Sequence, residues 1–126
     1  MRVDGQVALV TGAGRGIGKG CALALAEAGA EVIAMSRTES ELNEVTDEIQ
    51  TAGGSAHKLV CDVSDGAAVR EQISQIERLD ILVNNAGILK PSSLLDLTED
   101  DLEAMLQINC RGAVLVAQAA VRIMKQ

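Results

Sequence analysis

The strongest indication of the fold is a glycine-rich segment near the amino terminus: Thr11-Gly12-Ala13-Gly14-Arg15-Gly16-Ile17-Gly18. It follows a short apolar run over 7–11, expected to be a buried strand, and leads into a helical pattern over 15–28. Gly12 permits a tight turn, Gly16 lets the backbone approach a bound group, and Gly18 lets the helix pack close to the sheet. The free N–H groups and helix dipole of such a turn favour an anion such as a pyrophosphate. The alternative is a purely structural turn, because every register lacks the third glycine of the strict G-x-G-x-x-G fingerprint.

Strand-like and helix-like segments alternate along the rest of the chain. Further strands are expected over 32–35, 56–61 and 81–83. A second helix is expected to begin at Thr38 and Glu41, which have the spacing of a capping box, and to end at Gly53-Gly54. A third is indicated by the apolar face of Val69, Ile73 and Ile76. A cap at Thr98 and Asp101 precedes a long helix over 100–125. Strand–helix–strand units of this length imply a parallel sheet with right-handed crossovers. We therefore predict a single doubly wound, Rossmann-type α/β domain over residues 1–126, truncated to four strands in the order 3-2-1-4.

Composition excludes several classes of protein. The 126 residues are 48% hydrophobic and 23% charged, which is typical of a globular domain and not of a disordered chain. A net charge of −7 argues against nucleic acid or an anionic membrane as partner. No apolar run approaches the roughly 20 residues of a membrane span, and no leader is expected at the amino terminus. The three cysteines, Cys21, Cys61 and Cys110, fit neither a disulfide framework nor a metal site. We therefore expect no bound metal, and we expect the protein to reside in a reducing, cytoplasmic compartment.

Phe, Trp and Tyr are all absent. The core must therefore be aliphatic with methionine as filler. The absence also removes tyrosine as an acid in any reaction that these residues carry out.

The pattern Thr-Gly-x-x-x-Gly-x-Gly resembles that of the short-chain dehydrogenase/reductase family, and three further positions agree: Asp62-Val63 after the third strand, Asn84-Asn85-Ala86-Gly87 after the fourth, and Asn109 in the long helix. The resemblance covers essentially the whole chain, but only the first half of a usual family member. It implies a dinucleotide-binding oxidoreductase fold, in which Asp62 and Val63 hold the adenine and Asn109 is the asparagine of the active-site helix. The cofactor-binding residues that it implies are Gly12, Gly14, Arg15, Gly16, Ile17, Gly18, Ser36, Arg37, Asp62, Val63, Asn85, Ala86 and Gly87.

These later motifs also have plainer interpretations. Asp62 could be a loop residue before a helix cap at Ser64. Asn84-Asn85 could be an ordinary turn at a strand end. Asn109 could mark a kink or bond a neighbouring carbonyl.

The end of the second strand bears on the choice of cofactor. An acidic residue there would bind the ribose 2′-OH of NAD, whereas an arginine would take the 2′-phosphate of NADP. The chain has Ser36-Arg37 and no acid until Glu39, and the resemblance places Arg15 in the same region. NADP(H) is therefore favoured over NAD(H). The alternative is that both arginines are solvated surface residues.

Catalysis in the family that this chain resembles uses Asn, Ser, Tyr and Lys together. The serine and the Tyr-x-x-x-Lys pair would lie beyond residue 126, so only Asn109 has a counterpart. We expect a module that binds NADP(H) without turnover. The alternatives are an active carbonyl reductase in which Lys90, Ser92 or a symmetry mate supplies the acid, and a simplified Rossmann domain without activity. His57, the only histidine, lies at the start of the third strand, away from the carboxyl ends where such sites gather.

The predicted strand order leaves two open sheet edges. The third strand carries His57 and Lys58, and charge protects natural edges. The fourth strand, 81–83, is wholly apolar, and the second half of the long helix is apolar on nearly every face. We therefore expect a homodimer through strand 81–83, helix 100–125 or both.

Overall fold

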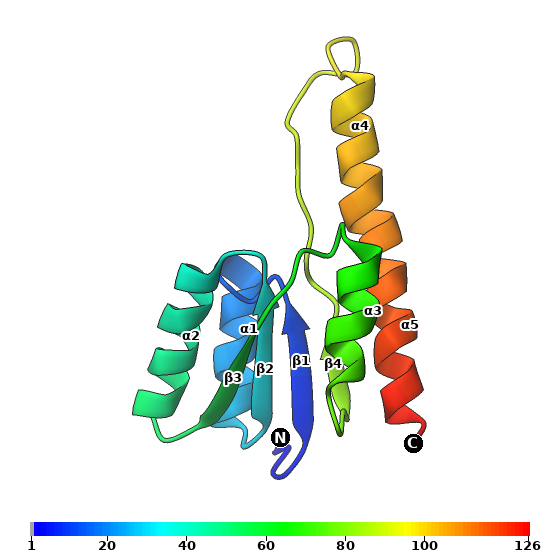
Figure 1. The fold of residues 1–126 in the computed structure, drawn as a ribbon. Helices are drawn as coiled ribbons and strands as arrows, with labels where there is room; N and C mark the ends of the chain where they lie inside the picture. The colour runs from blue at the N-terminus through cyan, green and yellow to red at the C-terminus, as the bar shows by residue number, and fades with distance from the viewer. Residues whose placement is uncertain (1) are drawn as a thin grey trace.

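The computed structural model describes residues 2–126, which form one parallel sheet between two layers of helices (Figure 1). The strands are β1 (Val7–Thr11), β2 (Glu31–Ser36), β3 (Ser55–Val60) and β4 (Ile81–Val83), in the order β3-β2-β1-β4. All three pairings are parallel, so the predicted doubly wound topology is confirmed. The direction of winding reverses between β1 and β4, and ligands of such sheets bind at this switch point.

Two pairs of helices cover the sheet (Figure 1). On one face lie α1 (Gly16–Glu27) and α2 (Glu39–Thr51), and on the other lie α3 (Gly66–Ser74) and α5 (Ala113–Met124). Each face has its own buried cluster, with Leu42 and Val45 of α2 in one and Val69 and Ile73 of α3 in the other. The core is aliphatic, as the lack of aromatic residues requires.

Several predicted element boundaries were wrong by a short distance. β2 is one residue longer at each end than predicted, β3 begins at Ser55 and stops before Cys61, and Ile76 lies beyond α3. The cap of α3 is Asp65, not Ser64: its Oδ1 accepts from the amides of Ala67 at 3.1 Å and Ala68 at 3.0 Å. A carboxylate can accept hydrogen bonds from both of these free amides at once. The Ser64 amide donates its own hydrogen bond to Asp62 Oδ1 at 2.9 Å.

The two predicted caps at helix starts had opposite outcomes. Thr98 Oγ1 accepts from the Asp101 amide at 3.1 Å, which confirms the cap of α4 (Glu99–Met105). The capping box of Thr38 and Glu41 was wrong, because the Thr38 side chain makes no cap hydrogen bond. Ser36 Oγ instead accepts from the Thr38 amide at 3.3 Å, and the Glu41 side chain lies against Gly14.

The long helix is continuous but not uniform. Between α4 and α5 a π-helical segment spans Leu106–Gly112, which the sequence did not predict. Val116, Ala119, Ala120 and Ile123 of α5 are buried against the sheet, whereas Val114, Val121 and Met124 are exposed. By length and composition alone, Glu99–Met124 qualifies as a membrane span, contrary to our expectation, although core helices of soluble proteins pass the same test.

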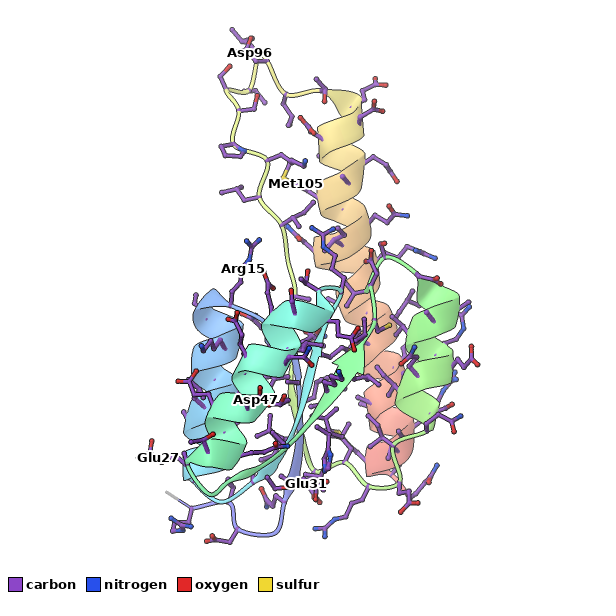
Figure 2. The ribbon with its side chains drawn as sticks, turned by 60° about the vertical axis from the view of Figure 1, so that its left-hand side comes forward. Arg15, Glu27, Glu31, Asp47, Asp96 and Met105 are labelled. Atoms are coloured by element: carbon purple, nitrogen blue, oxygen red, sulfur yellow. The ribbon has the colours of Figure 1, made fainter. Side chains whose placement is uncertain are left out.

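An arm projects beyond the carboxyl ends of the strands (Figure 1). It consists of α4 and the extended segment 84–98, with Asp96 near its tip and Met105 on its helical side (Figure 2). Leu89, Leu94 and Leu95 in the segment are 78%, 89% and 95% exposed. The arm therefore presents an apolar surface that the described chain leaves uncovered.

Candidate functional site

A hollow of about 460 Å³ opens at the carboxyl ends of the strands, above the switch point. Four connections meet there, one from the end of each strand. The lining residues are Gly12, Gly14, Arg15, Gly16, Ile17, Met35, Ser36, Arg37, Thr38, Glu41, Cys61, Asp62, Val63, Asn85, Ala86, Gly87, Ile88 and Ile108. The set contains every predicted cofactor-binding residue except Gly18. The sequence interpretation missed Met35, Thr38, Glu41, Cys61, Ile88 and Ile108.

Three of the four glycines of the turn have distinct geometries. Gly12 has a φ of +63°, and a Cβ there would lie 2.9 Å from Asn85 Nδ2 and 3.0 Å from Ala86 Cα. Gly16 has a φ of +55° and nothing within 4 Å of a Cβ position, so the backbone is open to a ligand. A Cβ at Gly18 would overlap the carbonyl oxygen of Gly12, which explains why α1 can pack so close to the turn.

The amino terminus of α1 is ready to receive an anion. Arg15 occupies the cap position without a side-chain cap bond, and the first turn of the helix contains no acidic residue. Its free amides and the positive end of the helix dipole therefore face the hollow. Ile17 lines the same place with its side chain 79% exposed. This arrangement fits the pyrophosphate of a dinucleotide.

Thr11 joins the turn after β1 to the loop after β4. Its side chain is fully buried, and Oγ1 accepts from the amides of Asn85 at 3.0 Å and Ala86 at 2.9 Å. In return, Asn85 Nδ2 donates to the Thr11 carbonyl oxygen at 3.1 Å. The hydroxyl thus fixes the floor of the hollow. The signal in the sequence was a polar residue that ends an otherwise apolar strand.

Two arginines stand at the end of the hollow near β2. Arg15 and Arg37 are both exposed, and neither forms an ion pair with any residue among 2–126. Figure 2 shows Arg15 projecting from the turn beyond the ends of α1 and α2. By contrast, Lys19 pairs with Glu48 and Lys58 with Glu39, each at 2.7 Å. The two guanidinium groups are therefore available to a negatively charged ligand.

The loop after β3 contributes Cys61, Asp62 and Val63. Burial raises the pKa of the Cys61 thiol, and the carboxylates of Asp65 and Asp62 raise it further, which disfavours the reactive thiolate. Asp62 Oδ1 holds the loop in a turn through the Ser64 amide, which accounts for one of its oxygens. Gly112 lets the long helix approach this loop, since a Cβ there would lie 2.9 Å from the Val63 carbonyl oxygen.

Asn109 lies in the π-helical segment, and its amide is used within the chain. Its Oδ1 accepts from the Ile88 amide and its Nδ2 donates to the Ile88 carbonyl oxygen, both at 2.8 Å. Ile88 lines the hollow, whereas Asn109 does not. In this structure Asn109 therefore positions the segment after Gly87. The neighbouring motif residue Asn84 points elsewhere and donates to the Ala113 carbonyl oxygen at 2.8 Å.

The other candidates lie outside the hollow. His57 is exposed on β3, with Nε2 3.2 Å from Glu31 Oε1. Lys90 and Ser92 are exposed in the extended segment and do not line the hollow. Among residues 2–126, no three metal-binding side chains gather into a cluster.

Known proteins are similar to this chain in sequence and in fold. A family model described as short chain dehydrogenase matches residues 6–126. The versicolorin reductase of Emericella nidulans is 41% identical over 130 residues, which cover 99% of this chain and 49% of that protein. The chain thus spans about half the length of the curated relatives that it matches.

Solved structures agree with the sequence matches. A short chain dehydrogenase from Burkholderia cenocepacia, in complex with NADP, is 40% identical with a TM-score of 0.91, covering 98% of this chain and 53% of that one. A gluconate 5-dehydrogenase from the same species, in complex with NADP and tartrate, is 41% identical with a TM-score of 0.90, covering 96% of this chain and 49% of that one.

Proposed function

The chain belongs to the short-chain dehydrogenase family, and on this premise we propose that its hollow binds the adenosine and pyrophosphate part of NADP(H). The observation that carries the proposal is the pair of exposed arginines, Arg15 and Arg37, beside an uncapped helix amino terminus. The amides of that helix would bind the pyrophosphate, and the guanidinium groups would bind a 2′-phosphate in charge-assisted hydrogen bonds. The NADP complexes of two similar proteins support this assignment.

The bound cofactor would supply the hydride of an oxidoreductase. The residues of this chain provide the surface that binds the cofactor, and Asn109 holds the segment at Ile88 in position beside it. They contain no tyrosine to give a proton to a substrate oxygen. General acid catalysis contributes about 10²–10⁴-fold to such reactions. We therefore propose that the 126-residue chain binds NADP(H) without measurable carbonyl reduction.

Calorimetric titration with NADPH and NADH tests the assignment. NADPH should bind more tightly, and Arg37→Ala should weaken NADPH roughly tenfold or more, because each charge-assisted contact is worth about 1.5–3 kcal/mol. NADH binding should change little. Equal affinities of the unaltered chain for the two cofactors would overturn the NADP(H) assignment. A ketone panel run beside the titration should show no NADPH oxidation, whereas turnover of about 1–10³ s⁻¹ would favour the active-reductase interpretation.

We also propose that the chain is a homodimer. The outer edge of β4 has no strand beside it within the described chain, and Val114, Val121 and Met124 of α5 are exposed. At the opposite edge, β3 carries the charged residue Lys58, which disfavours pairing with another strand. Its Nζ donates to Glu39 Oε1 and Asn43 Oδ1. A stable dimer typically buries about 1,200–2,000 Å² in total.

Sedimentation checks the oligomeric state. The unaltered chain should sediment as a dimer, and Leu82→Lys in β4 should dissociate it or cause aggregation, because Leu82 is partly buried against the core and a charge on an edge strand disfavours pairing with another strand. Val60→Lys, an exposed position on β3, is the matched control and should leave the dimer intact. A monodisperse monomer of the unaltered chain at high concentration would refute the proposal. Interference optics are needed, since the chain contains no Trp or Tyr.

A further inference from the structure

Glu41 brings a negative charge into a hollow that is otherwise suited to anions. A Cβ on Gly14 would lie 2.5 Å from Glu41 Oε2 and 3.2 Å from Ser36 Oγ, so the carboxylate rests where glycine leaves room. Among residues 2–126, this carboxylate takes part in no ion pair with a lysine or arginine. The nearby Glu39, by contrast, pairs with Lys58.

The position of Glu41 in the first turn of α2 explains why an acidic residue is favoured there, but not why its side chain points toward Gly14. Acidic residues in a first helical turn are stabilised by the helix dipole, and Glu39 and Glu41 both lie there. In a capping box, the Glu41 carboxylate would turn back to the Thr38 amide. That amide instead donates to Ser36 Oγ, and the carboxylate turns across the helix start to Gly14. It thereby joins Arg15, Ser36 and Arg37 on the wall of the hollow.

This wall is where the ribose 2′ position of a dinucleotide is distinguished, because it adjoins the end of β2. A carboxylate accepts a hydrogen bond from the 2′-OH of NAD(H) and repels the 2′-phosphate of NADP(H). Arg15 and Arg37 have the opposite preference. We propose that Glu41 is a second determinant of cofactor choice, which opposes the two arginines and lets the site accept NAD(H) as well. The inference rests on the proposed function, since it concerns the same hollow.

The test is a pair of calorimetric titrations, with NADPH and with NADH, on the unaltered chain and on Glu41→Gln. Removing the charge should raise NADPH affinity about tenfold and leave NADH affinity equal or lower, since two charges a few ångströms apart near a surface repel by more than the energy of a tenfold change. Glu44→Gln is the control, because it removes the same charge from the same helix outside the hollow. The control should change the ratio of the two affinities less than twofold.

Glu41→Asp separates the proposal from a role in helix stability alone. It keeps the charge at the start of α2 but draws the carboxylate back from Gly14. Under the proposal it shifts the ratio toward NADPH by part of the Glu41→Gln effect, whereas a purely structural role leaves the ratio at its original value. If the unaltered chain binds neither cofactor, the proposed function falls. If it binds but both Glu41 variants keep the original ratio, this inference alone is overturned.

Discussion

Gly18→Ala should destabilise the chain by about 3 kcal/mol or more and abolish NADPH binding. The new Cβ would overlap the Gly12 carbonyl oxygen and lie 2.6 Å from Asn85 Nδ2. The first of these neighbours is backbone, which is held at the end of β1, so α1 as a whole must move away. That movement carries the helix amides away from the place where the pyrophosphate is proposed to bind. Urea unfolding and calorimetric titration measure the two effects.

A second glycine of the same helix provides the control. Gly20 lies half a turn further along α1, and a Cβ there would have nothing within 4 Å. Gly20→Ala should stabilise the chain by up to about 1 kcal/mol, because alanine is the better helix former. A Gly18→Ala chain as stable as the Gly20→Ala chain would show that the close approach of α1 to the turn is not required.

Thr11→Val should lower the free energy of unfolding by about 2–4 kcal/mol. Valine has the shape of threonine, so the packing of this fully buried position is kept and only the hydroxyl is lost. The amides of Asn85 and Ala86 then have no acceptor in the loop that follows β4. We expect the loop to loosen and NADPH affinity to fall together with stability. The measurements are denaturant unfolding and the same calorimetric titration.

Thr46, the other buried threonine, is a matched control. Its Oγ1 donates to the Leu42 carbonyl oxygen at 2.9 Å, an acceptor that also belongs to the backbone bonding of α2. Thr46→Val should therefore change stability by less than about 1 kcal/mol, since no donor is left without a partner. An equal loss in the two valine variants would mean that the Thr11 hydroxyl has no special role in joining the strands.

The features predicted well from the sequence depend on local backbone chemistry. The turn of residues 11–18 requires glycine at positions with positive φ or close contact, and this requirement is visible in the residue type itself. The strand order follows from alternating segments and right-handed crossovers, which need no knowledge of side-chain contacts. For the same reason, the residues at the carboxyl ends of the strands could be assigned to one hollow from their order along the chain.

The features predicted poorly depend on choices between two nearly equivalent local partners. The spacing of Thr38 and Glu41 satisfies a capping box, yet it is the Ser36 hydroxyl that accepts the hydrogen bond of the Thr38 amide. The Glu41 side chain turns to Gly14 instead, because the missing side chain of this glycine, which lies outside the helix, leaves space for the carboxylate. The π-helical segment at Asn109 is similar. Its paired bonds to Ile88 join positions 21 residues apart, and such a contact leaves no periodic trace in the helix.

The division of the core by the sheet has a consequence for how this chain tolerates change. The clusters beneath α1 and α2 and beneath α3 and α5 share no buried residue, and the strands separate them. Substitutions in the two clusters therefore have few partners in common, and their effects on stability should be close to additive. Residues of α3 and α5 can then be substituted in many combinations without disturbing the cluster on the other face. In that cluster Leu42 and Val45 continue to hold α2, and with it the wall of the hollow, in place. Mutational independence of the two faces is thus a property of the layered fold itself.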